Sequence, residues 1–219
     1  MLGVQMEIPG VKLGMLEVEN VRVELVVPEL AREMDEVCES IRARQTLDEL
    51  MAGDEVLAVR AMFRAWGVDP ARYRPSSEAL LRRIVQGKGL YRVSSVVDIN
   101  NLCSVETGWP AGLYDREFIQ PPVMLRLGLR GEAYDGIGRH VWHPEGRPVL
   151  ADTAGPFGSP ISDSTRTMIR ESTHAVFTVF YAPAKTADAA VQQALARQVA
   201  LLERHAGARP VGQALLPPR

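Results

Sequence analysis

Polar side chains that could do chemistry crowd one short segment of the sequence, VVDINNLCSVETGWPAGLYD, which spans residues 96–115. Asp98 and Asn101 fall inside a predicted helix there, although Asp and Asn are poor helix formers. Such residues occur in helices where their side chains make specific hydrogen bonds, either capping a neighbouring loop or lining a polar pocket. A turn that begins at Gly108 brings the following residues back toward whatever this helix faces. The segment is therefore the first candidate for a binding site.

Several residues of this segment also admit a purely structural interpretation. Asp98 lies near the start of the helix, where a carboxylate commonly caps free backbone N–H groups. Asp115 either anchors a turn through its own backbone or contacts a ligand. Trp109 either packs as a lid or offers a stacking surface for a base or an aromatic amino acid. The pocket interpretation suits Asn101 better than Asp98.

A second polar segment, rich in Gly, Pro, Ser and Asp, is predicted to be a loop at residues 152–166. It carries two carboxylates, a hydroxyl and a guanidinium group: Asp152, Asp163, Ser164 and Arg166. Loops of this kind carry function more often than regular elements do. Asp152 follows a predicted strand, so it is either a pocket wall or a turn residue. Ser164 has no identifiable histidine partner, which argues against a Ser-His-Asp hydrolase.

A third group of residues is basic and lies just before the polar helix. Its members form the densest cluster of positive charge next to that helix: Arg82, Arg83, Lys88 and Arg92. They could contact RNA phosphates, or they could simply form a solvated helix end. The sequence leaves both interpretations open.

Hydrophobic periodicity and turn residues predict the elements that must position these side chains. The predicted strands are residues 16–27, 123–129, 147–151 and 175–181. The predicted helices are one or two within 29–50, then 54–66, 76–86, 96–106 (capped by Ser94 or Ser95) and 186–206. Helices cluster early, strands cluster late and a helix closes the chain. This order predicts an α+β fold with an antiparallel or mixed sheet.

Composition sets the remaining limits. The chain has 219 residues, of which 46% are hydrophobic, with a net charge of −2. We expect a single domain over residues 1–206 and a loose tail over 207–219. No signal peptide, membrane span, metal or cofactor is expected, and the two distant cysteines, Cys38 and Cys103, favour a reduced cytoplasmic protein. Near-zero net charge argues against tight, non-specific RNA binding. The oligomeric state stays open.

The polar segment resembles the B3/B4 domain of the bacterial phenylalanyl-tRNA synthetase beta subunit. In that family a V-x-D-x-x-N helix is followed by G-x-P and by an aromatic-Asp pair. The matching residues are Val96 or Val97, Asp98, Asn101, Gly108, Pro110, Tyr114 and Asp115. The resemblance extends over about residues 74–182 and implies the B3/B4 fold.

In the synthetase this domain hydrolyses tyrosine that is wrongly esterified to the phenylalanine tRNA. In this chain we expect Asn101 and Asp163 to be the catalytic residues. We expect substrate contacts by the rest of the motif and the loop: Asp98, Gly108, Pro110, Tyr114, Asp115, Asp152, Ser164 and Arg166. If tRNA binds, we expect Arg82, Arg83, Lys88 and Arg92 to contact its phosphates, because they form the densest basic cluster next to the motif. The chain departs from the family at two points: Gly112 aligns with a family histidine, and no glutamate aligns with the one that senses the tyrosine hydroxyl, although Asp163 is near.

Three functions remain open on this reading. The first is a free-standing editing domain that hydrolyses a mischarged aminoacyl-tRNA ester with a positioned water. The second is a non-catalytic module that binds tRNA or a small amino-acid-like ligand in the same pocket. The third is a structural or regulatory protein that kept the fold and lost the RNA. The two departures favour the second and third, while the polar helix and loop favour retained ligand binding.

Overall fold

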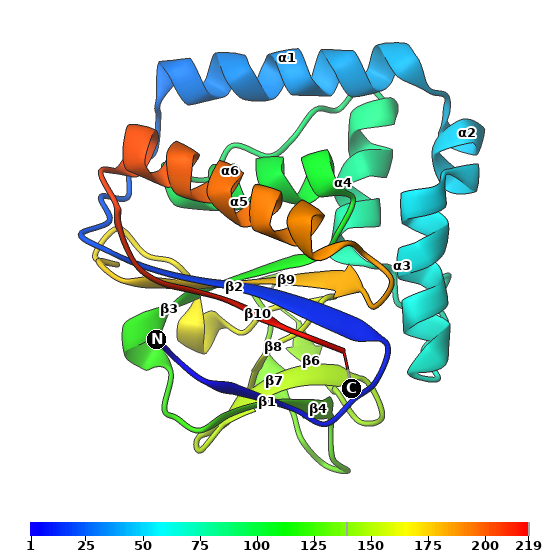
Figure 1. Ribbon diagram of the computed structural model, residues 1–219, viewed down its shortest axis with the longest axis vertical. Coiled ribbons are helices and arrows are strands. Elements are labelled where there is room, and N and C mark those ends of the chain that lie inside the picture. The colour runs from blue at the N-terminus through cyan, green and yellow to red at the C-terminus, as the bar shows by residue number, and fades with distance from the viewer. Residues whose placement is uncertain (139, 219) are drawn as a thin grey trace.

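The computed structural model describes residues 1–138 and 140–218 of the chain. Figure 1 shows helices gathered on one side of a sheet and a second sheet on the other side. The first sheet has strand order β10-β2-β9-β3, and the second has the order β1-β4-β7-β8. The predicted α+β class with antiparallel and mixed sheets is confirmed.

The first sheet is antiparallel throughout, with β2 (Val11–Glu19) and β9 (Val176–Pro183) at its centre. Both central strands are buried along nearly their whole length because helices cover one face and the second sheet faces the other. The outer strands are β3 (Ala111–Asp115) and β10 (Arg209–Leu216). Strand β3 pairs only with β9, so its other edge is left to face the site described below.

The second sheet is mixed. Strand β1 (Val4–Met6) runs parallel to β4 (Val123–Leu127), whereas β7 (Pro148–Asp152) pairs antiparallel with β4 and with β8 (Gly155–Gly158). A short hairpin of β5 (Tyr134–Asp135) and β6 (Val141–Trp142) lies outside both sheets.

Within residues 1–138 and 140–218, six α-helices pack on the first sheet or on one another. Their bounds are α1 (Pro28–Arg44), α2 (Leu47–Ala52), α3 (Asp54–Ala65), α4 (Ser76–Val85), α5 (Ser95–Thr107) and α6 (Asp188–Ala206). Helix α6 packs closely on β2 at Gly14, which has no side chain. A Cβ at that position would lie only 3.5 Å from the Leu195 side chain and would collide with Val191. Helix α1 lies outside α4 and α5 as an outer layer (Figure 1). Among the described residues, no helix combines the length and the apolar character needed to cross a membrane.

The structure corrects three predicted boundaries. The strand predicted at 16–27 begins at Val11 and ends at Glu19, because Asn20 adopts a left-handed φ of 60° that turns the chain. The alternating residues after it form a loop, and Leu25 and Val26 are exposed. The predicted loop at 152–166 contains β8, which extends the second sheet.

The C-terminal tail is the third correction. Residues 209–216 are not loose but form β10, which pairs with β2 along most of its length. Gly207, with a φ of 62°, ends α6 in the left-handed conformation and starts the return to the sheet. Proline-rich composition misled the prediction, because Pro210 sits on an edge strand beside a β-bulge, where its missing N–H is tolerated.

Candidate functional site

A cavity of about 260 Å³ lies where α5, β3 and the loop after β8 meet. Its wall is half apolar and half polar: Ser76, Val97, Asn100, Asn101, Ala111, Leu113, Ile137, Ser159, Ile161, Ser162, Asp163 and Ile169. The two residues assigned catalytic roles from the sequence, Asn101 and Asp163, therefore line one cavity although 62 positions separate them in the chain. Of all the predicted site residues, only these two line it directly.

Two neighbouring asparagines of α5 differ in how their side chains are used. Asn100 is buried and donates from Nδ2 to the Ala111 carbonyl (3.1 Å), while its Oδ1 accepts from Gln198 Nε2 (3.1 Å). Those bonds fasten α5 to β3 and α6. Asn101 is only partly buried, and its side chain makes no hydrogen bond to any residue that the structure describes. Its amide therefore faces the cavity with both donor and acceptor free for a ligand or water.

Asp163 also lines the cavity and is held by hydrogen bonds from β3 and from its own loop. Its Oδ1 accepts from the Tyr114 hydroxyl (3.0 Å) and from the Ser159 backbone N–H (3.1 Å). The Tyr114 hydroxyl also lies 3.4 Å from the hydroxyl of Tyr181. Burial raises the pKa of the Asp163 carboxyl to about 7, and the hydrogen bonds from Ser159 and Tyr114 offset part of that rise. Asp163 can therefore exchange a proton near neutral pH.

Tyr114 explains why position 112 lacks a side chain. The Tyr114 ring lies fully buried between Gly112 and Gly158, and a Cβ at either glycine would stand 2.6–2.7 Å from its Cζ. Burial and the nearby Asp163 raise the pKa of Tyr114 well above its usual range, so its hydroxyl stays protonated as a donor. The space beside Gly112 is therefore filled by the ring of Tyr114, two residues further along the same strand.

Three serines of the cavity were not singled out from the sequence. Ser159 forms a tight turn, since its Oγ accepts from the backbone N–H groups of Ile161 (3.2 Å) and Ser162 (2.9 Å). The hydroxyls of Ser76 and Ser162 have no hydrogen-bond partner within the described part of the chain, so they can serve a ligand. The Ser-Pro turn signal at Ser159 was visible in the sequence, but nothing local indicated that it faces α5.

The structure places four motif residues away from the cavity, in structural roles. Asp98 accepts from the Val93 N–H (2.9 Å) at the start of α5, which is the capping alternative weighed from the sequence. Gly108 ends α5 in the left-handed conformation and lies beside Glu55. The Pro110 carbonyl accepts from the Tyr181 N–H (2.9 Å). Asp115 accepts from Glu117 N (3.1 Å) and Thr173 Oγ1 (2.6 Å), which anchors the turn after β3.

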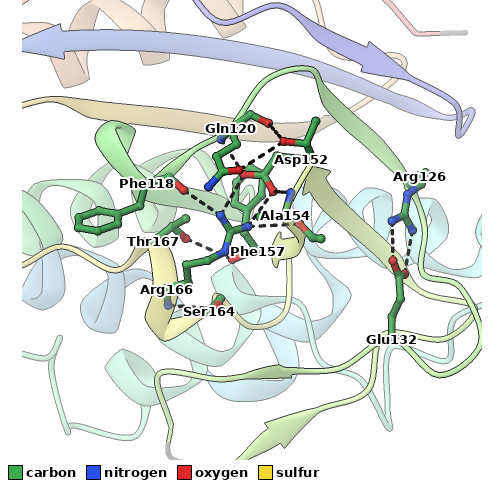
Figure 2. Close-up of polar contacts among 12 residues, drawn as sticks. Phe118, Gln120, Arg126, Glu132, Asp152, Ala154, Phe157, Ser164, Arg166 and Thr167 are labelled. Atoms are coloured by element: carbon green, nitrogen blue, oxygen red, sulfur yellow. Dashed lines mark hydrogen bonds and ion pairs between the residues drawn. The ribbon is translucent and has the colours of Figure 1, made fainter.

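The three remaining loop residues also point elsewhere (Figure 2). Arg166 donates two parallel hydrogen bonds of 2.9 and 3.0 Å to the buried carboxylate of Asp152. Asp152 also accepts from the backbone N–H groups of Gln120 (2.8 Å) and Ala154 (2.9 Å). Ser164 caps the short 3-10 helix at Thr165–Thr167 by accepting from Arg166 N (3.1 Å). The expected substrate contacts by this trio are corrected, because their polar atoms already bond one another.

Three of the four predicted tRNA-binding residues lie together in the structure, and the fourth does not. Arg82, Arg83 and Lys88 line a second hollow of about 280 Å³ beside α4. Arg92 does not join them, because its guanidinium pairs with Asp35 and donates to the Ala31 carbonyl (3.0 Å) on α1.

Neither thiol nor metal chemistry is indicated within the described residues. Cys103 is fully buried inside α5, and burial raises the pKa of its thiol, so it stays protonated and unreactive. Trp109 is buried in the core rather than presented as a stacking surface. No group of three or more His, Cys, Asp or Glu side chains could hold a metal ion in residues 1–138 and 140–218.

Comparison with known proteins identifies the family. The B3/4 domain model matches residues 58–207, which is most of the chain. A crystal structure of an N-terminal fragment of the phenylalanyl-tRNA synthetase beta subunit from Pyrococcus horikoshii is similar at 15% identity and a TM-score of 0.48, covering 98% of this chain. The chain spans 55% of that fragment. No curated protein sequence shows significant similarity to the chain. The matched residues include the polar helix, β3 and the Asp163 loop, and the chain belongs to the B3/4 domain family.

Proposed function

We propose that the cavity between α5 and the Asp163 loop binds the aminoacyl end of a charged tRNA and hydrolyses its ester. The observation that carries this proposal is the pairing of Asn101 and Asp163 across one cavity of about 260 Å³. An uncommitted amide and a carboxyl group whose pKa lies at about 7 line the same cavity. Family membership supports the same substrate class, because the B3/B4 domain of the synthetase edits mischarged tRNA.

The cavity supplies groups for each part of an aminoacyl ester. Its apolar wall, which includes Leu113, Ile161 and Ile169, suits an amino-acid side chain. The described lining contains one acidic side chain, Asp163, and no basic one, a set that suits an α-ammonium group better than a free carboxylate. An ester retains the ammonium and lacks the carboxylate. The lining therefore favours an aminoacyl ester over a free amino acid.

Hydrolysis in such a site needs only a positioned water. Asp163 in its carboxylate form accepts a proton from the water, whose oxygen then bonds to the ester carbonyl carbon. The Asn101 amide can donate to the developing oxyanion, an effect worth about 3 kcal/mol for a well-placed donor. The ester C–O bond breaks, and the ribose oxygen takes the proton. Ser164 and Cys103 take no part, since the first caps a 3-10 helix and the second lies inside α5.

A deacylation screen tests this proposal. Purified protein is incubated with a panel of correctly and incorrectly charged tRNAs, and the remaining aminoacyl-tRNA is measured. We expect at least one ester to be hydrolysed, and Asn101→Ala to slow that reaction about 100-fold. Because the Asn101 side chain bonds no described residue, the same substitution should change the free energy of unfolding by only about 0.5 kcal/mol.

Two outcomes of that screen would refute the mechanism. One is an Asn101→Ala protein that is folded and fully active. The other is a covalent aminoacyl adduct on Ser164 or Cys103, detected by mass spectrometry of a quenched reaction.

One observation favours a binding module without catalysis as the second candidate. The Tyr114 ring takes the space beside Gly112, where the family carries a histidine, and it hydrogen-bonds Asp163 directly. A chain that has lost a family side chain in this manner can keep the pocket without the reaction. Binding of a non-hydrolysable amide-linked aminoacyl-tRNA, without deacylation of any ester in the panel, would favour this candidate.

A further inference from the structure

A basic hollow beside α4 is a second candidate for ligand binding, separate from the cavity. It has a volume of about 280 Å³ and is lined by Arg74, Ala79, Arg82, Arg83, Gln86, Lys88 and Tyr91. Four of these seven residues are cationic, and none is acidic. This concentration of positive charge stands out in a chain whose net charge is −2.

The protein neutralises only part of the positive charge around this hollow. Glu78 is the nearby carboxylate, buried beneath α4, and it is shared by three guanidinium groups, those of Arg60, Arg74 and Arg82. Arg83 and Lys88 have no acidic partner within the described residues. One carboxylate thus pairs with three arginines, while two further cations have no acidic partner among the described residues. An anion bound in the hollow would meet an uncompensated positive field.

An aromatic residue lies within the same hollow. The Tyr91 ring is 52% exposed, and the Arg83 guanidinium lies over one of its faces, 4.0 Å from the ring centre. A stacked pair of this kind presents a flat surface on which a nucleotide base can stack. Proteins that bind single-stranded nucleic acid commonly combine cationic side chains with an exposed aromatic ring.

One face of α4 connects the hollow to the cavity. Ser76 lines the cavity, whereas Ala79, Arg83 and Gln86 line the hollow. The spacing from Ser76 is three, seven and ten residues, which places all four on the same side of the helix. A rise of 1.5 Å per residue separates Ser76 from Arg83 by about 10 Å along the axis. A strand whose esterified end enters the cavity would therefore reach the hollow within its last nucleotides.

We infer that this hollow binds the phosphates of the single-stranded 3′ end of an RNA, which lies along α4 and ends in the cavity. The inference rests on the proposed function, since it takes the esterified end to be the group in the cavity. It replaces Arg92 with Arg74 and Tyr91 in the RNA-binding set. Arg83 and Lys88 supply the free charges, and Tyr91 supplies the stacking surface.

The test compares two double variants of equal charge. Arg83→Gln with Lys88→Gln removes both open cations, while Arg130→Gln with Lys185→Gln removes two exposed cations elsewhere on the surface. Binding to fluorescently labelled, uncharged tRNA is measured by anisotropy at several salt concentrations. We expect the first variant to bind at least about 10-fold more weakly, with a salt slope lower by roughly 1–2, and the second to bind as wild type does. Tyr91→Ala should weaken binding about 5-fold or more.

A small substrate separates failure of this inference from failure of the proposed function. A 3′-O-aminoacyl nucleoside needs only the cavity, so Arg83→Gln with Lys88→Gln should raise KM for charged tRNA at least about 10-fold more than it raises KM for this small ester. Unchanged tRNA affinity in that variant, or no tRNA binding by wild type at low salt, overturns the RNA site even where the small ester is hydrolysed. Equal loss of tRNA binding in both double variants also overturns it, because binding would then follow net charge alone.

Discussion

Two polar regions that both draw on the 152–166 segment use their side chains in opposite ways. Around Asp152 and Arg166, each charged group bonds the other, and backbone groups satisfy the remaining oxygens (Figure 2). Around Asn101 and Asp163, the amide and two serine hydroxyls have no partner in the described chain. The first region is closed and stabilises the fold, whereas the second keeps polar groups available to a ligand.

This difference shows that polarity alone does not mark a site. Asp152, Ser164 and Arg166 looked as reactive in the sequence as Asp163, and they lie in the same fifteen-residue segment. What distinguishes them is whether hydrogen-bonding capacity remains once the chain is folded. Substitutions in the closed region should therefore change stability, and substitutions in the open region should change activity.

The largest effect is expected from Asp152→Ala. Removing one partner of a buried pair leaves the other charge uncompensated, at a cost of about 3–5 kcal/mol. Urea denaturation should show this loss, and thermal unfolding should show a midpoint roughly 10 °C lower. Glu132→Ala is the control: the Glu132 carboxylate is 19% exposed and accepts from one backbone N–H, whereas Asp152 is fully buried and accepts from two, so the loss should be smaller (Figure 2). Equal losses in the two variants would contradict the distinction.

Gly112→Ala should rank second. The added methyl group would collide with the Tyr114 ring, which is fully buried and has Gly158 on its other side. Overpacking of this kind costs about 1–3 kcal/mol, and here it should also displace the hydroxyl that bonds Asp163. Denaturation measures the first effect, and in a Tyr114→Ala background, which lacks the ring, the Gly112→Ala substitution should cost much less than it does in the wild type. A fully stable Gly112→Ala protein would show that the ring is not confined there.

A pH-dependent effect is expected from Asp163→Asn. The folded carboxyl has a pKa of about 7, raised above the value of about 4 in the unfolded chain, so the folded protein binds more protons between those values. Stability of the wild type should therefore fall as pH rises from about 4 through 7, by on the order of 1–2 kcal/mol.

Asp163→Asn should lack that pH-dependent loss. Urea denaturation at pH 5 and pH 8 for both proteins measures the difference. The same variant should also lose the increase in enzymatic deacylation through pH about 7, after subtraction of uncatalysed hydrolysis. If the free energy of unfolding changes with pH by the same amount in both proteins, Asp163 is not the titrating group.

The smallest effects are expected from Ser164→Ala and Cys103→Ala. Loss of the Ser164 cap should cost about 1 kcal/mol of stability, and neither change should alter the deacylation rate by more than about threefold. Both follow from the separation of these side chains from the cavity lining. A large rate loss in a protein that remains stable would place one of them in the reaction after all.

Local sequence signals determined much of the fold and part of the site. Periodicity predicted the helices near their observed bounds, because an amphipathic stripe depends only on spacing along one segment. Asn101 stood out since a poor helix former in a helix interior demands an explanation. The structural alternative for Asp98 could also be recognised in the sequence, because its hydrogen-bond partner, Val93, lies only five residues away.

Only the tertiary structure decided which polar groups meet. The Asp152–Arg166 pair, the Tyr114 ring over Gly112 and the pairing of β10 with β2 depend on strand register and on contacts between distant segments. Asn101 and Asp163 line one cavity because α5, β3 and the loop after β8 meet around it. Whether the polar groups of a side chain have hydrogen-bond partners depends on residues that lie next to it only in the folded chain. A local sequence pattern does not predict those residues.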